Sequence, residues 1–98
     1  MNNLPLLEDL RLFCVDVRKR SFAACATELG VSPAYVSKRI AALEAALAAR
    51  LLHRTTRRVT VTEQGETVHQ WARRILDDVS EMTEAVSSAR TALRGPLR

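Results

Sequence analysis

The last third of the chain carries an apolar residue at every third or fourth position without interruption. The intervals alternate between four and three residues over more than three heptads, which is typical of a helix with one continuous apolar seam. Thr62 is a suitable N-cap for this helix, Gly65 is a mild cost inside it, and no stronger helix breaker occurs before Gly95-Pro96. The pattern therefore predicts one long helix over residues 62–94, a rod of roughly 50 Å.

Such a helix needs a partner, because an exposed rod is not stable by helix propensity alone. The residues before it are too few to cover its whole length, so we expect a homodimer through this helix. The residues predicted to pair are Val68, Trp71, Ala72, Ile75, Val79, Met82, Val86, Ala89 and Leu93.

Residues 5–61 predict a small helical lobe. A first helix runs from about Leu6 to Arg20, and Ser21 is a good N-cap for a second helix that ends at Gly30. Ser32-Pro33 is a strong start for a third helix, because serine caps well and proline suits the first helical position. Two helices joined by a tight turn, over about 21–40, predict a helix-turn-helix; a generic helical bundle is the alternative.

The segment over about 51–61 predicts a hairpin, because LLHR and RVTV read as two short strands around a polar turn. A hairpin after a helix-turn-helix is a wing. Its tip holds His53, Arg54, Thr55, Thr56, Arg57 and Arg58. The three arginines and two threonines among them supply cationic groups and short hydroxyl donors, the side chains that meet phosphate oxygens. The predicted fold is mainly α: a winged helix-turn-helix, with three helices and a two-stranded wing, followed by a long dimerisation helix.

Size and charge narrow the function. A chain of 98 residues excludes large enzymes and doubly wound nucleotide folds. Residues 1–62 hold ten cationic and five acidic side chains, whereas residues 63–98 hold five and six, so the first part is basic and suggests a polyanionic partner. His53 and His69 lie in different elements, both are expected at the surface, and no metal spacing or glycine-rich phosphate loop occurs. We therefore expect no enzyme activity, no metal and no cofactor.

The cellular setting follows from what the sequence lacks. It shows no secretory leader and no apolar stretch of about 18 residues, so no membrane partner is expected. Cys14 and Cys25 fall in apolar helical stripes and are interpreted as core residues, which fits a reducing cytoplasm.

The third helix has a narrow outward face of mostly small side chains. With Val36 toward the core, Ala34, Lys38, Ala41 and Ala45 lie on the opposite side and Ser37 lies at the flank. Lysine can donate hydrogen bonds to guanine, serine can donate or accept one, and alanine can contact a thymine methyl group. This face therefore suits the major groove of DNA. The alternative is that the alanines are helix formers on a solvated face. Arg39 lies nearer the core, where it would pair with a phosphate or an acid, and Tyr35 is equally suited to packing and to phosphate contact.

The stretches SFAACATELGVSPAYVSKRIAALEAAL and RLLHRTTRRVTVTEQGE resemble the N-terminal DNA-binding domain of LysR-type transcriptional regulators. The match runs from about Leu6 to Arg94. It implies a linker helix that pairs antiparallel in a dimer, a hinge that begins at residues 95–98, and an absent effector domain that would bind a small-molecule inducer. Within the family, the segments SPAYVSKRI and LLHRTTRRVTVTE are most similar to regulators of the catabolism of hydroxydicarboxylic acids such as D-malate or tartrate.

The resemblance also implies residue roles. Base and phosphate contacts at the third helix would come from Ser32, Pro33, Ala34, Ser37 and Lys38, a phosphate contact from Ser21, and wing contacts from Arg54, Thr55, Arg57 and Arg58. Two residues depart from the family pattern. Pro33 replaces a frequent glutamine and cannot donate a hydrogen bond, and Ala48 replaces a frequent glycine, so the third helix runs on or ends under slight strain.

Two hypotheses of function therefore remain. The first is sequence-specific binding of double-stranded DNA by a homodimer in transcription control, at an inverted repeat with half-sites spaced by whole turns of ~10 base pairs. The second is an oligomerisation or protein-docking module with a merely solvated basic face. Neither needs a small molecule in this part of the protein.

Overall fold

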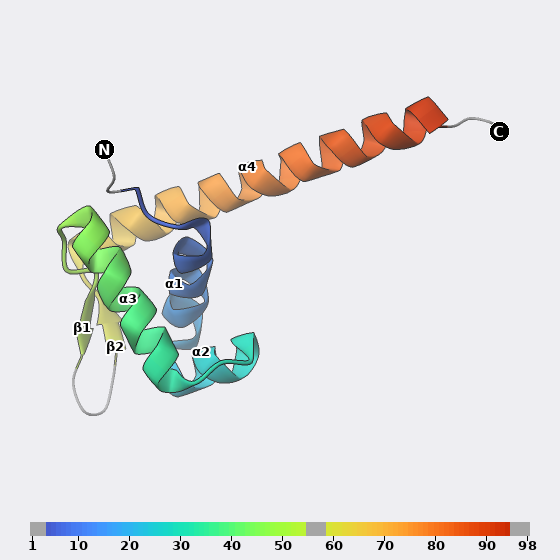
Figure 1. The fold of residues 1–98 in the computed structure, drawn as a ribbon. Coiled ribbons are helices and arrows are strands. Elements are labelled where there is room, and N and C mark those ends of the chain that lie inside the picture. The colour runs from blue at the N-terminus through green and yellow to red at the C-terminus, as the bar shows by residue number, and fades with distance from the viewer. Residues whose placement is uncertain (1–3, 55–58, 95–98) are drawn as a thin grey trace.

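The computed structural model describes residues 4–54 and 59–94. The elements follow in the order α1 (Leu7–Lys19), α2 (Phe22–Leu29), α3 (Pro33–Leu47), β1 (Leu52–Arg54), β2 (Val59–Val61) and α4 (Glu63–Arg94). Figure 1 shows α1, α2 and α3 gathered with the two strands into one lobe, from which α4 projects as a rod. The predicted fold class, a winged helix-turn-helix followed by a long helix, is confirmed.

The two ends of α2 and the start of α3 form where the sequence predicts them, because each has a local cap. The Ser21 Oγ accepts a hydrogen bond from the Ala24 N–H at 3.1 Å, and the Ser32 Oγ accepts one from the Tyr35 N–H at 3.0 Å. Gly30 ends α2 in the left-handed conformation, with φ of 71°. Ala48 ends α3 in the same region, with φ of 53°, so the helix stops there under the strain that a Cβ brings.

The core lies where the three lobe helices meet the wing and the start of α4. Its largest fully buried apolar side chains are Phe13, Val36, Ile40, Leu43, Leu51 and Leu52. Cys25 is also fully buried, which raises the pKa of its thiol to about 11, and Cys14 is half-buried; both are free thiols in the core, as predicted. α1 is buried on more than one face, because α2, α3 and α4 all pack against it.

The two strands form an antiparallel pair in which Leu52 faces Val61 and Arg54 faces Val59. The chain then enters α4 through Thr62, whose Oγ1 accepts a hydrogen bond from the Gly65 N–H at 2.9 Å, as an N-cap does. The same hydroxyl donates to the Arg50 carbonyl oxygen at 2.6 Å. One side chain thus joins the wing to the long helix.

Three sequence-based expectations need correction at α4. Ala72 is 1% exposed and packs in the core of the lobe, so it offers no surface to a second copy. His69 is half-buried rather than on the surface, and its ring meets the edge of Phe13 at a centroid distance of 6.4 Å. Gly65 is not a mild cost but a requirement, because a Cβ there would overlap the Leu51 carbonyl oxygen.

No helix in the described part of the chain has the length and the apolar character needed to cross a membrane. Among the same residues, no group of three or more histidine, cysteine or carboxylate side chains is arranged to hold a metal ion.

Candidate nucleic-acid interface

The first turns of α3 form an exposed surface. Ser32, Pro33, Ala34 and Tyr35 are all exposed, and Lys38 is exposed one turn later. Ser37 is half-buried at the flank, and the opposite face of the helix is buried through Val36, Ile40 and Leu43. The structure thus brings the candidate residues of α3 together at one helix end, on a helix that is held from behind by the core.

The turn before α3 is held by backbone hydrogen bonds. The Gly30 N–H donates to the Thr27 carbonyl oxygen at 3.3 Å, and the Val31 N–H donates to the Ala26 carbonyl oxygen at 3.0 Å. These bonds satisfy the last carbonyls of α2 and fix the angle at which the chain enters α3. Ser21 is half-buried at the start of α2, where its hydroxyl serves as the cap of that helix.

α3 is tied to α1 by an ion pair. The Arg39 Nε donates to Asp9 Oδ1 at 2.8 Å, and its Nη2 donates to Asp9 Oδ2 at 2.6 Å. The hydrogen bond and the charge of Asp9 raise the pKa of the Arg39 guanidinium further above its usual range. Of the two roles predicted for Arg39, phosphate contact or acid pairing, the structure places it in the second.

The wing is tied to the far end of α3 by Glu44. Its Oε2 accepts hydrogen bonds from the Leu51 N–H at 2.8 Å and from the Leu52 N–H at 3.3 Å. Sequence reasoning missed both Asp9 and Glu44 as supports of α3, since an acidic residue near a helix end gives no sign of a partner far along the chain. The wing-tip residues Thr55, Thr56, Arg57 and Arg58 and the side chain of Arg54 lie outside the described residues, so their predicted contacts stay predictions.

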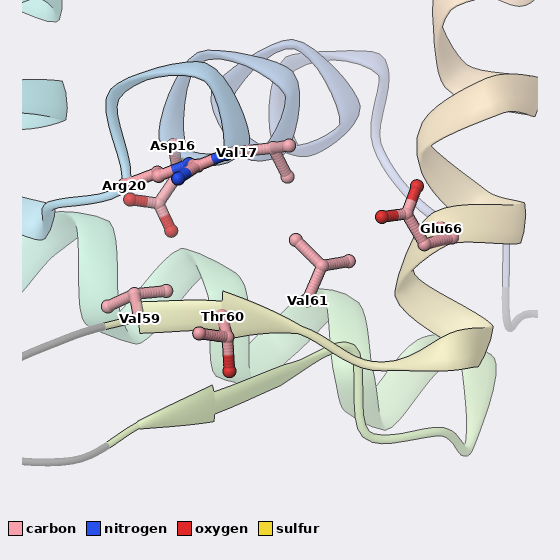
Figure 2. Close-up of a pocket in the computed structure, with 7 residues that line it drawn as sticks. All are labelled: Asp16, Val17, Arg20, Val59, Thr60, Val61 and Glu66. Atoms are coloured by element: carbon pink, nitrogen blue, oxygen red, sulfur yellow. The ribbon is translucent and has the colours of Figure 1, made fainter.

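A cavity of about 430 Å³ lies between the end of α1 and strand β2. Figure 2 shows its lining: Asp16 and Val17 come from α1 and Arg20 is the residue that caps the C-terminal end of α1, while Val59, Thr60 and Val61 make up β2 and Glu66 comes from the first turns of α4. It includes no residue of α3, so it lies at the base of the wing and apart from the exposed surface of the third helix.

A second exposed surface runs along α4. Four large apolar side chains are between 37% and 60% exposed there: Trp71, Ile75, Met82 and Val86. We call these four residues the outer stripe. Of the other residues predicted to pair, Val68 packs against the lobe core, Val79 is half-buried and Ala89 is exposed, and the side chain of Leu93 lies outside the described residues. The Arg74 guanidinium lies over the Trp71 ring at 5.1 Å. At about 100° per residue, the outer stripe points roughly 80° away from Gly65 and Ala72, the buried residues of α4 that face the lobe.

Comparison with known proteins agrees with this architecture. Residues 7–66 match the family model described as "Bacterial regulatory helix-turn-helix protein, lysR family". The HTH-type transcriptional regulator DmlR of Escherichia coli (strain K12) is 60% identical over 98 residues, which are all of this chain and 32% of that protein. The HTH-type transcriptional activator TtdR of the same strain is 38% identical over the same share of each chain. The chain thus spans about a third of the length of these curated relatives.

Solved structures give the same picture. The complex titled BenM_DBD/catB site 1 DNA has a TM-score of 0.84 and 30% sequence identity, and the match covers 88% of this chain and 96% of that one. Full-length CbnR with its target DNA has a TM-score of 0.81 and 30% identity, over 86% of this chain and 29% of that one. These matches confirm the resemblance found in the sequence. The relatives are named as transcriptional regulators and not as enzymes, which agrees with the expectation that this chain has no enzyme activity. Because the family model matches more than half of its residues, the chain belongs to the lysR family of bacterial regulatory helix-turn-helix proteins.

Proposed function

We propose that this chain is the DNA-binding part of a LysR-type transcriptional regulator and binds double-stranded DNA in a sequence-specific way as a homodimer. The observation that carries the proposal is the first half of α3. It presents an exposed, mostly small face with one cation, Lys38, on a helix whose other face is fully buried. The complexes of BenM and CbnR with DNA support it, since they share this fold.

The proposed contacts follow from the chemistry of each side chain. Lys38 donates to guanine O6 or N7, Ser37 bonds a base edge, and the small Ala34 lets the helix approach a thymine methyl. Pro33 has no N–H to donate, so it shapes the helix start and leaves base readout to Ser37 and Lys38. The groups proposed to bind phosphate or sugar are Ser21, Ser32, Tyr35, Arg54, Thr55, Arg57 and Arg58.

The outer stripe supports the homodimer. An antiparallel pair related by a two-fold axis would bury the stripe of each copy against that of the other. Because the lobe points roughly 80° away from the stripe, both lobes then project to the same side of the helix pair. Two lobes on one side suit an inverted repeat read on one face of the duplex, with half-sites spaced by ~10 base pairs or a multiple of it.

The proposal extends to the whole protein. An effector domain would follow the hinge that begins at residues 95–98 and would bind an inducer, so that the regulator acts in the cytoplasm on genes for hydroxydicarboxylic acid catabolism. The 60% identity to DmlR supports a place in this subgroup.

The test starts from duplexes that the purified chain selects from a random pool. We expect the selected duplex to bind far more tightly than random DNA, and we expect the affinity for both to fall steeply with salt, because phosphate contacts release counterions. Lys38→Ala should reduce the discrimination by about 1–3 kcal/mol. Arg11→Ala is the matched control, since it removes an equal charge from an exposed site on α1, where Arg11 pairs with Glu8. Equal affinity for all duplexes and a flat salt response would contradict the proposal and favour a protein-docking module.

A further inference from the structure

We propose that Arg39 is a positioning residue, whose ion pair with Asp9 fixes the rotation of α3 about its own axis and so sets where Lys38 and Ser37 enter the groove. The inference rests on the proposed function, because it concerns how the same helix reads DNA. It assigns discrimination between sequences to a contact that touches no DNA, and it excludes Arg39 as a phosphate ligand.

The geometry of the pair is directional. Two nitrogens of one planar guanidinium donate to the two oxygens of one carboxylate, at 2.8 and 2.6 Å. Such a fork fixes the angle between its partners as well as their distance. The carboxylate is itself well held, because Asp9 lies in the first turn of α1 and its side chain is only 6% exposed.

The apolar contacts of α3 do not fix the rotation equally well. Val36, Ile40 and Leu43 lie within about 40° of one direction on the helix, and apolar burial is not directional. A rotation of ~15° keeps all three against the core, yet it moves an atom ~6 Å from the axis by ~1.5 Å. A contact that reads a base needs a placement within ~0.5 Å.

Arg39 is placed to resist that rotation. It lies about 60° from Val36 on the flank of α3 that faces α1, and Lys38, the residue immediately before it, lies about 100° further round on the outward side. A rotation that shifts Lys38 would therefore also break the fork.

The same pair argues against phosphate binding by Arg39. Its charge is already matched by Asp9, and its side chain is 25% exposed. If the guanidinium turned toward a phosphate, it would leave a carboxylate in a buried position without its cation, which is unfavourable.

The experiment uses the 98-residue chain and compares Asp9→Asn, Arg39→Gln and the double variant with wild type. Glu8→Gln is the matched control, because it removes the neighbouring carboxylate of α1 from an exposed position. Affinity is measured for the wild-type selected duplex and for random DNA over a range of salt, at a temperature where thermal melts show each variant folded.

We expect each single variant to lower the ratio of selected to random affinity roughly tenfold. The slope of log affinity against log salt concentration, and the affinity for random DNA, should equal those of the Glu8→Gln control. The double variant should be no worse than either single one, since both changes remove the same contact.

Two results would overturn the inference. A salt slope reduced by about one for Arg39→Gln alone, with equal weakening on both duplexes, would make Arg39 a phosphate ligand. An unchanged ratio in all three variants would limit the pair to stabilising the lobe. Failure of the proposed function is separate, because it appears in the wild-type chain as a lack of discrimination.

Discussion

At the scale of single residues, Gly65 marks a close approach of the long helix to the base of the wing. A Cβ at this position would overlap the Leu51 carbonyl oxygen and lie 2.6 Å from Val61 Cγ1. Because the first of these is backbone, the contact cannot be relieved by turning a side chain. We expect Gly65→Ala to lower the free energy of unfolding by about 2–4 kcal/mol, measured by urea denaturation.

Gly30 supplies the comparison. It has φ of 71° and no atom within 4 Å of an added Cβ, so Gly30→Ala meets only backbone strain of about 1 kcal/mol. If Gly30→Ala and Gly65→Ala lowered the free energy of unfolding equally, the wing would have to move aside to admit the Cβ at residue 65. The close contact between α4 and the base of the wing would then not be rigid.

His69 makes stability depend on pH. Burial against α1, and secondly the charge of Arg73, lower the pKa of His69, while Glu66 acts in the opposite direction. The unfolded chain then binds a proton more readily than the folded one. The contribution of neutral His69 is complete above the ordinary value of 6.5 and is lost as the pH falls below it, toward the lowered pKa.

We therefore expect the melting temperature to fall between pH 7.5 and about 5.5, and to fall less in His69→Gln. His53→Gln is the control, because His53 is exposed on the wing. A pH profile that is the same in His69→Gln and in wild type would contradict the assignment.

At the scale of elements, the sequence predicts the boundaries well and the packing only in part. Caps depend on neighbours within four residues, so Ser21, Gly30 and Ser32-Pro33 mark their helix ends correctly. The exposed face of α3 was also predictable, because the buried residues of that helix follow one simple period.

What the sequence does not predict joins elements that are distant along the chain. Asp9 and Arg39 are 30 residues apart, and no local pattern selects one acid among several as the partner. Ala72 belongs to a regular apolar seam, yet the lobe covers only the first part of that seam. Periodicity identifies an apolar face but does not say whether this chain or another one covers it.

Thr62 is the joint between two elements, which leads to a prediction at this scale. Its hydroxyl donates to Arg50 at the foot of the wing and caps α4, so Thr62→Val removes both bonds while keeping the shape of the side chain. We expect a loss of about 2–3 kcal/mol in the free energy of unfolding.

Thr67→Val is the matched control, since the Thr67 hydroxyl is exposed and, within the part of the chain that the structure describes, donates to the Glu63 carbonyl oxygen one turn earlier in the same helix. It should change stability by less than about 0.5 kcal/mol. If Thr67→Val lowered the free energy of unfolding as much as Thr62→Val does, the hydrogen bonds that Thr62 makes to Arg50 and Gly65 would contribute little to stability.

At the scale of the whole molecule, α4 presents two different faces, one buried in the lobe and one exposed. Its first turns complete the core of the lobe through Gly65 and Ala72, and Figure 1 shows the remainder extending well beyond that lobe. The side chains of the outer stripe leave a large apolar surface in water along this rod. If this apolar surface were buried against a second copy, the dimer would carry two DNA-binding lobes on the same side of the helix pair.

Met82 lies near the middle of the outer stripe and is 60% exposed, so it tests this arrangement without disturbing the lobe. Met82→Asp places a charge where the two copies would meet, and an unpaired charge in an apolar interface is strongly unfavourable. We expect sedimentation to show a monomer that melts without the concentration dependence of wild type and binds the selected duplex weakly. Ser80→Asp adds the same charge about 160° around the helix and should leave the dimer intact. Either of two results would contradict this arrangement: a Met82→Asp variant that remains a dimer, or a Ser80→Asp variant that dissociates to the same extent. The copies would then have to meet through another face of α4, and the outer stripe would not hold the two lobes on one side of the helix pair.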